Sequence, residues 1–108
     1  LLLYRFTANR GILLDGHKFS DYKYTIIEFY SDYWLGCTAS QFIVNEFTKN
    51  YPEIPIVSIN ARKKGYEEIT ERYRLKYTPT YVLVDQNAEK IYRRVGSFSY
   101  EKFKSLIT

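Results

Sequence analysis

Cysteine is almost missing from this chain of 108 residues, which has one cysteine, one histidine and no methionine. A single cysteine cannot close a disulfide within the chain, so its stability does not depend on an oxidising compartment. Zinc sites that need several Cys or His ligands are excluded for the same reason. We therefore expect no bound metal and no other cofactor.

Long hydrophobic runs are also missing. Hydrophobic residues make up 45% of the chain and charged residues 26%, which is typical of a globular domain. No run approaches the roughly 20 apolar residues of a membrane-spanning helix, so we expect no such segment. The length suits one domain, residues 1–108, in which residues 1–24 have the least informative pattern.

The chain begins at Leu1 and contains no methionine. We expect it to be either a processed product or a domain excised from a longer chain, and a secretory or membrane-anchored parent stays open. The sequence does not indicate a compartment or an oligomeric state.

The one histidine, His17, lies in the sequence Asp15-Gly16-His17-Lys18, which we interpret as a turn. Loops are polar and lie on the surface. We therefore expect an exposed loop histidine rather than a catalytic one.

Basic residues outnumber acidic ones by 16 to 12, which makes nucleic acid or an acidic membrane surface a partner class to consider. A surface that follows a phosphate backbone needs its charges on one face. The sequence spreads them over a loop at 62–64, a helix end at 72–76 and a late strand at 93–94. Basic residues at a helix C-terminus also have a structural explanation, because they balance the partial negative charge of the last carbonyls. We expect that nucleic acid is not the partner.

The apolar pattern predicts the order strand, helix, strand, helix, then a hairpin and a last helix. A short continuous apolar run with one acid predicts a strand at 25–30, and a β-branched run predicts one at 54–59. A short polar loop joins predicted strands at 80–84 and 90–95. Helices are predicted at 37–50, from Gly65 to Tyr73, and after Ser99, which we expect to cap the last one. Near the start we expect an edge strand around 12–14 and a helical turn at 17–22.

Helix 37–50 has apolar residues at steps of three and four, which predict its buried face. These residues are Ala39, Phe42, Ile43 and Phe47. The order of elements predicts an α/β fold with a mixed sheet of four or five strands and helices on both faces.

Three segments resemble the thioredoxin family. Residues 29–37, Phe-Tyr-Ser-Asp-Tyr-Trp-Leu-Gly-Cys, are similar to the family pattern Phe-x-x-x-Trp-Cys-Gly-Pro-Cys. Residues 73–80, Tyr-Arg-Leu-Lys-Tyr-Thr-Pro-Thr, resemble its Tyr-Gly-Ile-x-x-x-Pro-Thr, and Val95-Gly96-Ser97 resembles its Val-Gly-Ala. Their order and spacing extend over residues 25–107. The resemblance implies a thioredoxin fold with a cis peptide bond before Pro79.

The likeness breaks at the redox-active cysteines. Without gaps, Tyr33 takes the place of the family's tryptophan, Trp34 that of the nucleophilic cysteine, and Cys37 that of the resolving cysteine. Dithiol exchange needs both thiols, so we expect a redox-inactive or redox-weak domain. In the alternative register, Cys37-Thr38-Ala39-Ser40 is a monothiol Cys-x-x-Ser motif, and Cys37 would be the catalytic nucleophile of a thiol–disulfide oxidoreductase.

Without the nucleophile, the resemblance implies a groove that binds a protein or peptide segment. Its residues are Tyr33, Trp34, Leu35, Tyr77, Thr78, Pro79 and Gly96. We expect the Trp34 ring at the surface, and the alternative is that it fills space in the core.

Glu28 stands where many thioredoxins have a buried acid beneath the cysteines. A buried carboxyl group needs partners or water. Because no nucleophile requires it, we favour an acid that is open to solvent or held by a lysine over a buried acid that transfers protons.

Overall fold

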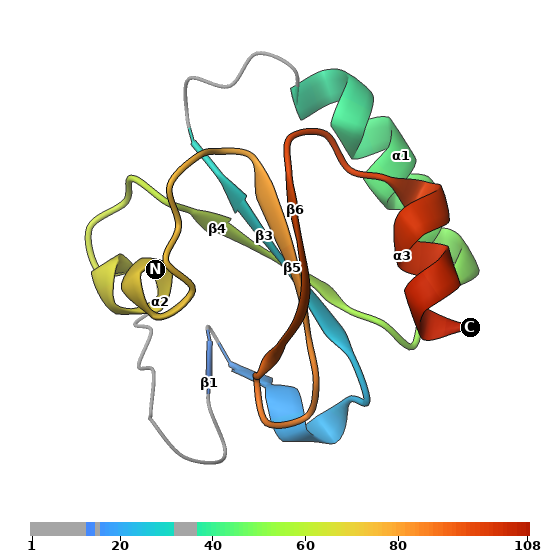
Figure 1. Ribbon diagram of the computed structural model, residues 1–108, viewed down its shortest axis with the longest axis horizontal. Helices are drawn as coiled ribbons and strands as arrows, with labels where there is room; N and C mark the ends of the chain where they lie inside the picture. The colour runs from blue at the N-terminus through green and yellow to red at the C-terminus, as the bar shows by residue number, and fades with distance from the viewer. Residues whose placement is uncertain (1–12, 15, 32–36) are drawn as a thin grey trace.

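The computed structural model describes residues 13–14, 16–31 and 37–108, and its main feature is a mixed four-stranded sheet (Figure 1). The strands are β3 (Thr25–Tyr30), β4 (Ile56–Asn60), β5 (Thr80–Val84) and β6 (Lys90–Val95). They lie in the order β4-β3-β5-β6. Strand β3 is parallel to β4 and antiparallel to β5, and β6 is antiparallel to β5.

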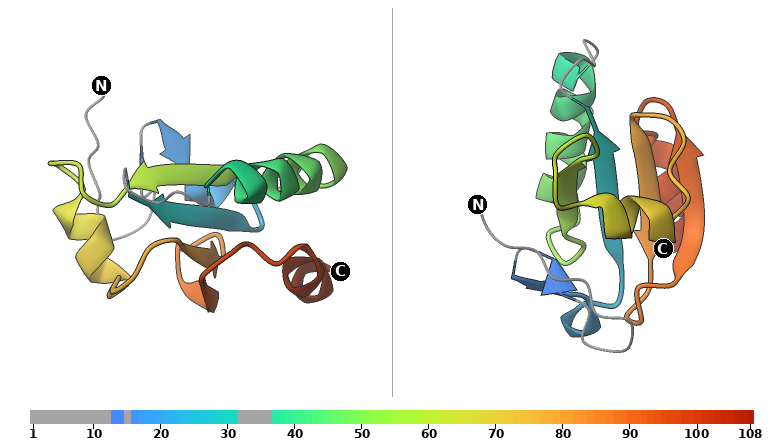
Figure 2. Two further views of the ribbon diagram at one scale, coloured as in Figure 1. Left: turned by 90° about the horizontal axis from the view of Figure 1, so that it is seen from above. Right: turned by 90° about the vertical axis from the view of Figure 1, so that its left-hand side faces the viewer.

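Helices cover both faces of this sheet. Helix α2 (Glu67–Arg72) lies on one face, whereas α1 (Cys37–Asn50) and α3 (Tyr100–Ile107) lie on the other (Figure 1 and Figure 2). Because successive side chains of a strand point to opposite faces, neighbouring residues of β3 belong to different cores. Ile27 packs with the α2 side and Ile26 with the α1 and α3 side. The continuous apolar run of β3 is therefore buried on both faces, as its sequence predicts.

The packing of α1 corrects one sequence prediction. Phe47 is buried as expected, but Phe42 is 75% exposed and Ile43 also reaches solvent. Val44 takes the buried position, and Tyr51 continues the same face just beyond the helix. At about 100° per residue, Phe42 lies about 140° around the helix from Phe47, so the two rings cannot face one core. The side chain of Ala39 lies outside the described part.

The N-terminal part corrects another prediction. Strands β1 (Leu13–Leu14) and β2 (His17–Lys18) form a separate two-stranded antiparallel sheet, not an edge of the main sheet. The expected helical turn is present as a 3-10 helix, η1 (Phe19–Asp21), but His17 lies in the strand before it. Phe19 is fully buried and joins the core on the α2 side.

Two further local predictions concern α3 and membrane insertion. The Ser99 hydroxyl accepts a hydrogen bond from the backbone N–H of Lys102, so Ser99 caps α3 as the sequence predicts. Across residues 13–14, 16–31 and 37–108, no helix combines the length and apolar character needed to span a bilayer.

Candidate functional site

The segment between α2 and β5 forms the centre of the candidate site. The peptide bond between Thr78 and Pro79 is cis, and the Pro79 side chain is buried. The Gly96 N–H donates to the Pro79 carbonyl at 2.9 Å, and the Thr80 hydroxyl donates to the Tyr77 carbonyl at 2.6 Å. Gly96 has a φ of 103°, a conformation that favours glycine. The Gly96 contact fixes the turn after β6 against Pro79, and the Thr80 contact closes the segment around Pro79 on itself.

A surface pocket of about 220 Å³ lies beside this segment, and we call it the cis-proline pocket. It is lined by Ser31, Ala61, Arg62, Leu75, Lys76, Tyr77 and Thr78. These residues come from the ends of β3 and β4 and from the segment before Pro79, which the parallel pairing of β3 with β4 brings together. The Tyr77 side chain is 67% exposed, so it offers contact area to a partner.

The aromatic loop that the sequence singles out lies outside the described residues. This holds for Tyr33, Trp34 and Leu35, whose placement stays a prediction. Ser31, the residue that enters this segment, lines the cis-proline pocket. The backbone of Cys37 belongs to α1, and its side chain is not described.

Glu28 is buried, which corrects the interpretation favoured from the sequence. It is only 5% exposed, and no lysine holds it among the described residues. The Ser58 hydroxyl donates to its Oε1 at 2.5 Å, and the Tyr81 hydroxyl donates to its Oε2 at 2.9 Å. Burial is tolerated because hydroxyl donors from the two neighbouring strands satisfy both carboxyl oxygens.

His17 also differs from the expectation of an exposed loop residue. Its ring is half-buried, stacked on Tyr22 at 5.0 Å and edge-on to Phe19 at 4.8 Å. Its Nε2 lies 3.2 Å from the Thr25 hydroxyl. Burial lowers the pKa of His17, and the nearby Asp21 carboxylate opposes that shift. These contacts give His17 a packing role between β2, η1 and β3.

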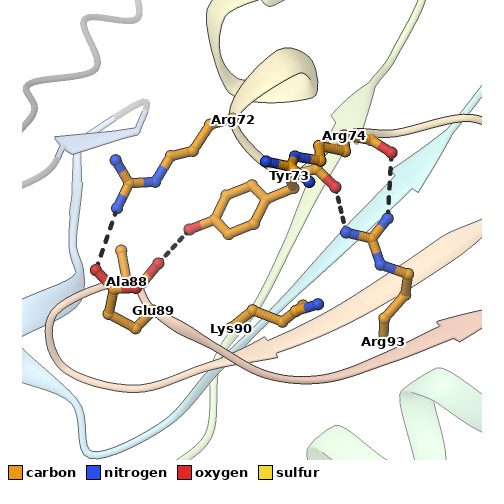
Figure 3. Close-up of a pocket in the computed structure, with 7 residues that line it drawn as sticks. All are labelled: Arg72, Tyr73, Arg74, Ala88, Glu89, Lys90 and Arg93. Atoms are coloured by element: carbon orange, nitrogen blue, oxygen red, sulfur yellow. Dashed lines mark hydrogen bonds and ion pairs between the residues drawn. The ribbon is translucent and has the colours of Figure 1, made fainter.

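The structure gathers basic residues that the sequence placed on separate elements. Arg72, Arg74, Lys90 and Arg93 line one pocket of about 330 Å³ around the Tyr73 side chain (Figure 3). No residue spacing indicates this grouping, because it depends on how the β5–β6 hairpin packs against the end of α2. The sequence argument that these charges are scattered was therefore wrong for this cluster.

Tyr73 joins the two elements of that pocket. Its hydroxyl donates to the Ala88 carbonyl at 2.6 Å, and burial raises the pKa of Tyr73 to about 12, although a hydrogen bond and the positive charge of Arg72 oppose the shift. No group of three or more His, Cys, Asp or Glu side chains in the described part could hold a metal ion.

Comparison with known proteins places this geometry in a family. No protein-family model matches the chain. The chain is 31% identical over 81 residues to Thioredoxin-1 of Drosophila melanogaster, covering 74% of this chain and 69% of that protein. It is 30% identical over 96 residues to Thioredoxin-1 of Drosophila yakuba, covering 85% of this chain and 83% of that protein.

Solved structures agree on the fold. The germline-specific thioredoxin Deadhead of Drosophila melanogaster superposes with a TM-score of 0.67 at 24% identity, covering 82% of this chain and 81% of that chain. A mutant thioredoxin from Halobacterium salinarum superposes with a TM-score of 0.69 at 22% identity, covering 82% and 74%. The chain therefore belongs to the thioredoxin family and has the thioredoxin fold.

Proposed function

We propose that this thioredoxin-family domain binds an extended segment of another protein at the cis-proline pocket and the aromatic loop, and that it does not catalyse dithiol exchange. The observation that carries the proposal is the single cysteine of the chain. Dithiol exchange needs one thiolate to attack and a second thiol to resolve the mixed disulfide. With Cys37 alone, a mixed disulfide has no internal route to release.

Two features of the cis-proline pocket support binding of an extended segment. Tyr77 presents a largely exposed ring, and tyrosine is enriched among residues that dominate interface energies. Among the residues that the structure describes, the Thr78 backbone N–H and carbonyl make no hydrogen bond. A peptide that lies beside Thr78 in extended conformation therefore finds a free donor and a free acceptor.

Trp34 has a defined role in this proposal. It occupies the position of the family's attacking cysteine, and we propose that its ring lies beside Tyr77 and Pro79 in contact with the partner. An interfacial Trp contributes about 2 kcal/mol or more, so Trp34→Ala should weaken binding roughly thirtyfold without unfolding the domain. If Trp34 belongs to the core, the same change would cost about 3–5 kcal/mol of stability.

The test starts by selecting peptides from a displayed random library on the wild-type domain. Their affinities are then measured for Trp34→Ala and Tyr77→Ala by fluorescence anisotropy. Tyr22→Ala is the matched control, because Tyr22 is an exposed tyrosine that precedes β3, whereas the cis-proline pocket adjoins its other end. Affinity lost in the first two variants and kept in the third supports the proposal. No selected peptide, or equal loss in all three variants, contradicts it.

The alternative function is a monothiol oxidoreductase that uses Cys37 in its Cys-x-x-Ser motif. Family membership favours it, because the similar proteins are named thioredoxins. The Cys37 thiolate would attack a protein or glutathione disulfide, and an external thiol would release the mixed disulfide, since Ser40 cannot.

Titration of the folded protein with a disulfide reagent separates the two functions. Rapid reaction of Cys37 and measurable turnover with an external thiol would establish the alternative. Trp34→Cys tests the register of the motif: a disulfide with Cys37 under oxidant supports the ungapped alignment. No disulfide would favour Cys37 as the nucleophile position.

A further inference from the structure

Two adjoining pockets form a positively charged groove beside the end of α2 and strand β6. Their volumes are about 330 and about 320 Å³, and both are lined by Arg74, Lys90 and Arg93. The first also includes Arg72 and the second Lys76. We call these five basic residues the basic groove. The acidic side chain among the lining residues is Glu89.

Hydrogen bonds join the two sides of the groove, which are the end of α2 and the β5–β6 hairpin. The Arg93 guanidinium donates to the backbone carbonyls of Tyr73 and Arg74, which follow α2 (Figure 3). The Tyr73 hydroxyl reaches the Ala88 carbonyl in the β5–β6 turn. A guanidinium at a helix C-terminus also balances the partial negative charge of the last carbonyls. Arg93 therefore fixes the shape of the groove.

Three other cations of the groove are available to a ligand. Arg74, Lys76 and Lys90 are exposed, and within the described residues their charged groups make no hydrogen bond or ion pair. Glu89 does not neutralise them, because its carboxylate contacts Arg72 at 3.8 Å. Like charges gathered without a counter-ion repel one another and favour a partner with negative charge.

The position of the groove indicates an extended peptide. The second groove pocket shares Lys76 and Tyr77 with the cis-proline pocket, so the two surfaces are continuous. It also includes Val95, which is 54% exposed, and β6 is the outer strand of the sheet. A strip that combines cations with exposed apolar side chains suits a peptide better than a uniformly charged phosphate backbone.

We propose that the segment bound at the cis-proline pocket continues into the basic groove and places Asp or Glu side chains against Arg74, Lys76 and Lys90. This inference rests on the proposed function and adds the chemistry of the partner: an acidic segment of a protein. The charges would set which segments bind and how fast they associate.

The test uses a short fluorescein-labelled peptide of alternating Glu and Ala and the same peptide with Gln in place of Glu. The groove variant is Arg74→Glu with Lys90→Glu, because neither residue lines the cis-proline pocket. The control is Lys63→Glu with Lys64→Glu, two exposed loop residues whose reversal changes the net charge equally. Lys90→Gln serves as a milder groove variant, and a urea unfolding curve checks that each variant is folded.

We expect the Glu peptide to bind the wild type about tenfold more tightly than the Gln peptide at low salt, and this preference to shrink above about 0.1 M salt. The groove variant should lose about tenfold in affinity for the Glu peptide, Lys90→Gln about threefold, and the loop control less than about twofold.

Three results would overturn the inference: equal affinity for the two peptides, equal loss in the groove variant and the loop control, or displacement of the Glu peptide by a single-stranded oligonucleotide at a lower concentration than by unlabelled peptide. The proposed function is tested separately by Tyr77→Ala. Binding that depends on Tyr77 but not on the groove contradicts the acidic segment and leaves the cis-proline pocket standing. Binding that depends on the groove but not on Tyr77 supports the acidic segment and contradicts the cis-proline pocket.

Discussion

Removal of the Tyr81 hydroxyl should destabilise the domain by about 1–3 kcal/mol, the cost of losing a hydrogen bond to a buried carboxyl group. Tyr81 is fully buried and Glu28 is 5% exposed, so water cannot easily replace the lost donor. Tyr81→Phe keeps the ring, which packs edge-on against Phe98 at 5.1 Å. The substitution therefore isolates the hydroxyl from the aromatic packing.

Urea unfolding is the assay, and a neighbouring tyrosine provides the control. With an m-value of about 2 kcal/mol/M, a loss of about 2 kcal/mol lowers the unfolding midpoint by roughly 1 M. Tyr92→Phe on β6 removes a hydroxyl for which no hydrogen bond is found in the described part of the chain, and its ring also packs against a buried phenylalanine, Phe103. It should change stability by less than about 0.5 kcal/mol.

The two hydrogen bonds to Glu28 also predict which substitution costs more stability. Ser58 lies on β4 with an exposed side chain, so water can replace its hydroxyl, and Ser58→Ala should cost less than Tyr81→Phe. Combining Tyr81→Phe with Glu28→Gln should reveal a coupling of about 0.5–3 kcal/mol between the two positions. A Tyr81→Phe effect no larger than that of Tyr92→Phe, with no coupling to Glu28, would refute this account of the buried acid.

Three other outcomes follow from packing and titration. Phe103→Ala should lower the free energy of unfolding by about 3–5 kcal/mol, because Phe103 is fully buried against Tyr92 and Phe98. In the same assay, Phe42→Ala on the exposed side of α1 should change it by less than about 0.5 kcal/mol. Tyr73 keeps its proton to about pH 12 when folded and releases it near pH 10 when unfolded, so the folded state should lose about 2–3 kcal/mol between these pH values. Tyr73→Phe should flatten that decline, and an equally steep decline in the variant would contradict the assignment. The pKa of His17 is lowered in the folded state, so its contribution to the free energy of unfolding is complete above about pH 6.5 and decreases as the pH falls below that value. Urea unfolding curves should therefore show that His17→Gln loses less stability on acidification than the wild type.

Local pattern was enough to predict the order of elements and the fold. A continuous apolar run marks a strand buried on both faces, as in β3, and a serine before an amphipathic stretch marks a capped helix, because both signals act within a few residues. The pattern failed where two faces of one helix were both apolar. Ile43 and Val44 each fit a helical repeat with Phe47, and only the packing against the sheet shows that Val44 is the inner one.

The candidate site depends more on contacts distant in sequence. The partners of Glu28 are 30 and 53 residues away along the chain, so its burial could not be read from its neighbours. The basic groove forms because the β5–β6 hairpin packs back on the end of α2, which joins charges some twenty residues apart. The role of Trp34 stays a prediction from its place in the family pattern.

Within the part of the chain that the structure describes, the sheet divides the interior into two compartments that share no buried side chain. Ile26 and Ile27 are adjacent in sequence, yet each packs only within its own compartment. Substitutions confined to opposite compartments have few shared partners, so their effects should add rather than couple. The basic groove lies over the compartment of α2, whereas Glu28 points into that of α1 and α3. Substitutions in the basic groove should therefore leave the buried acid and its hydroxyl donors as they are.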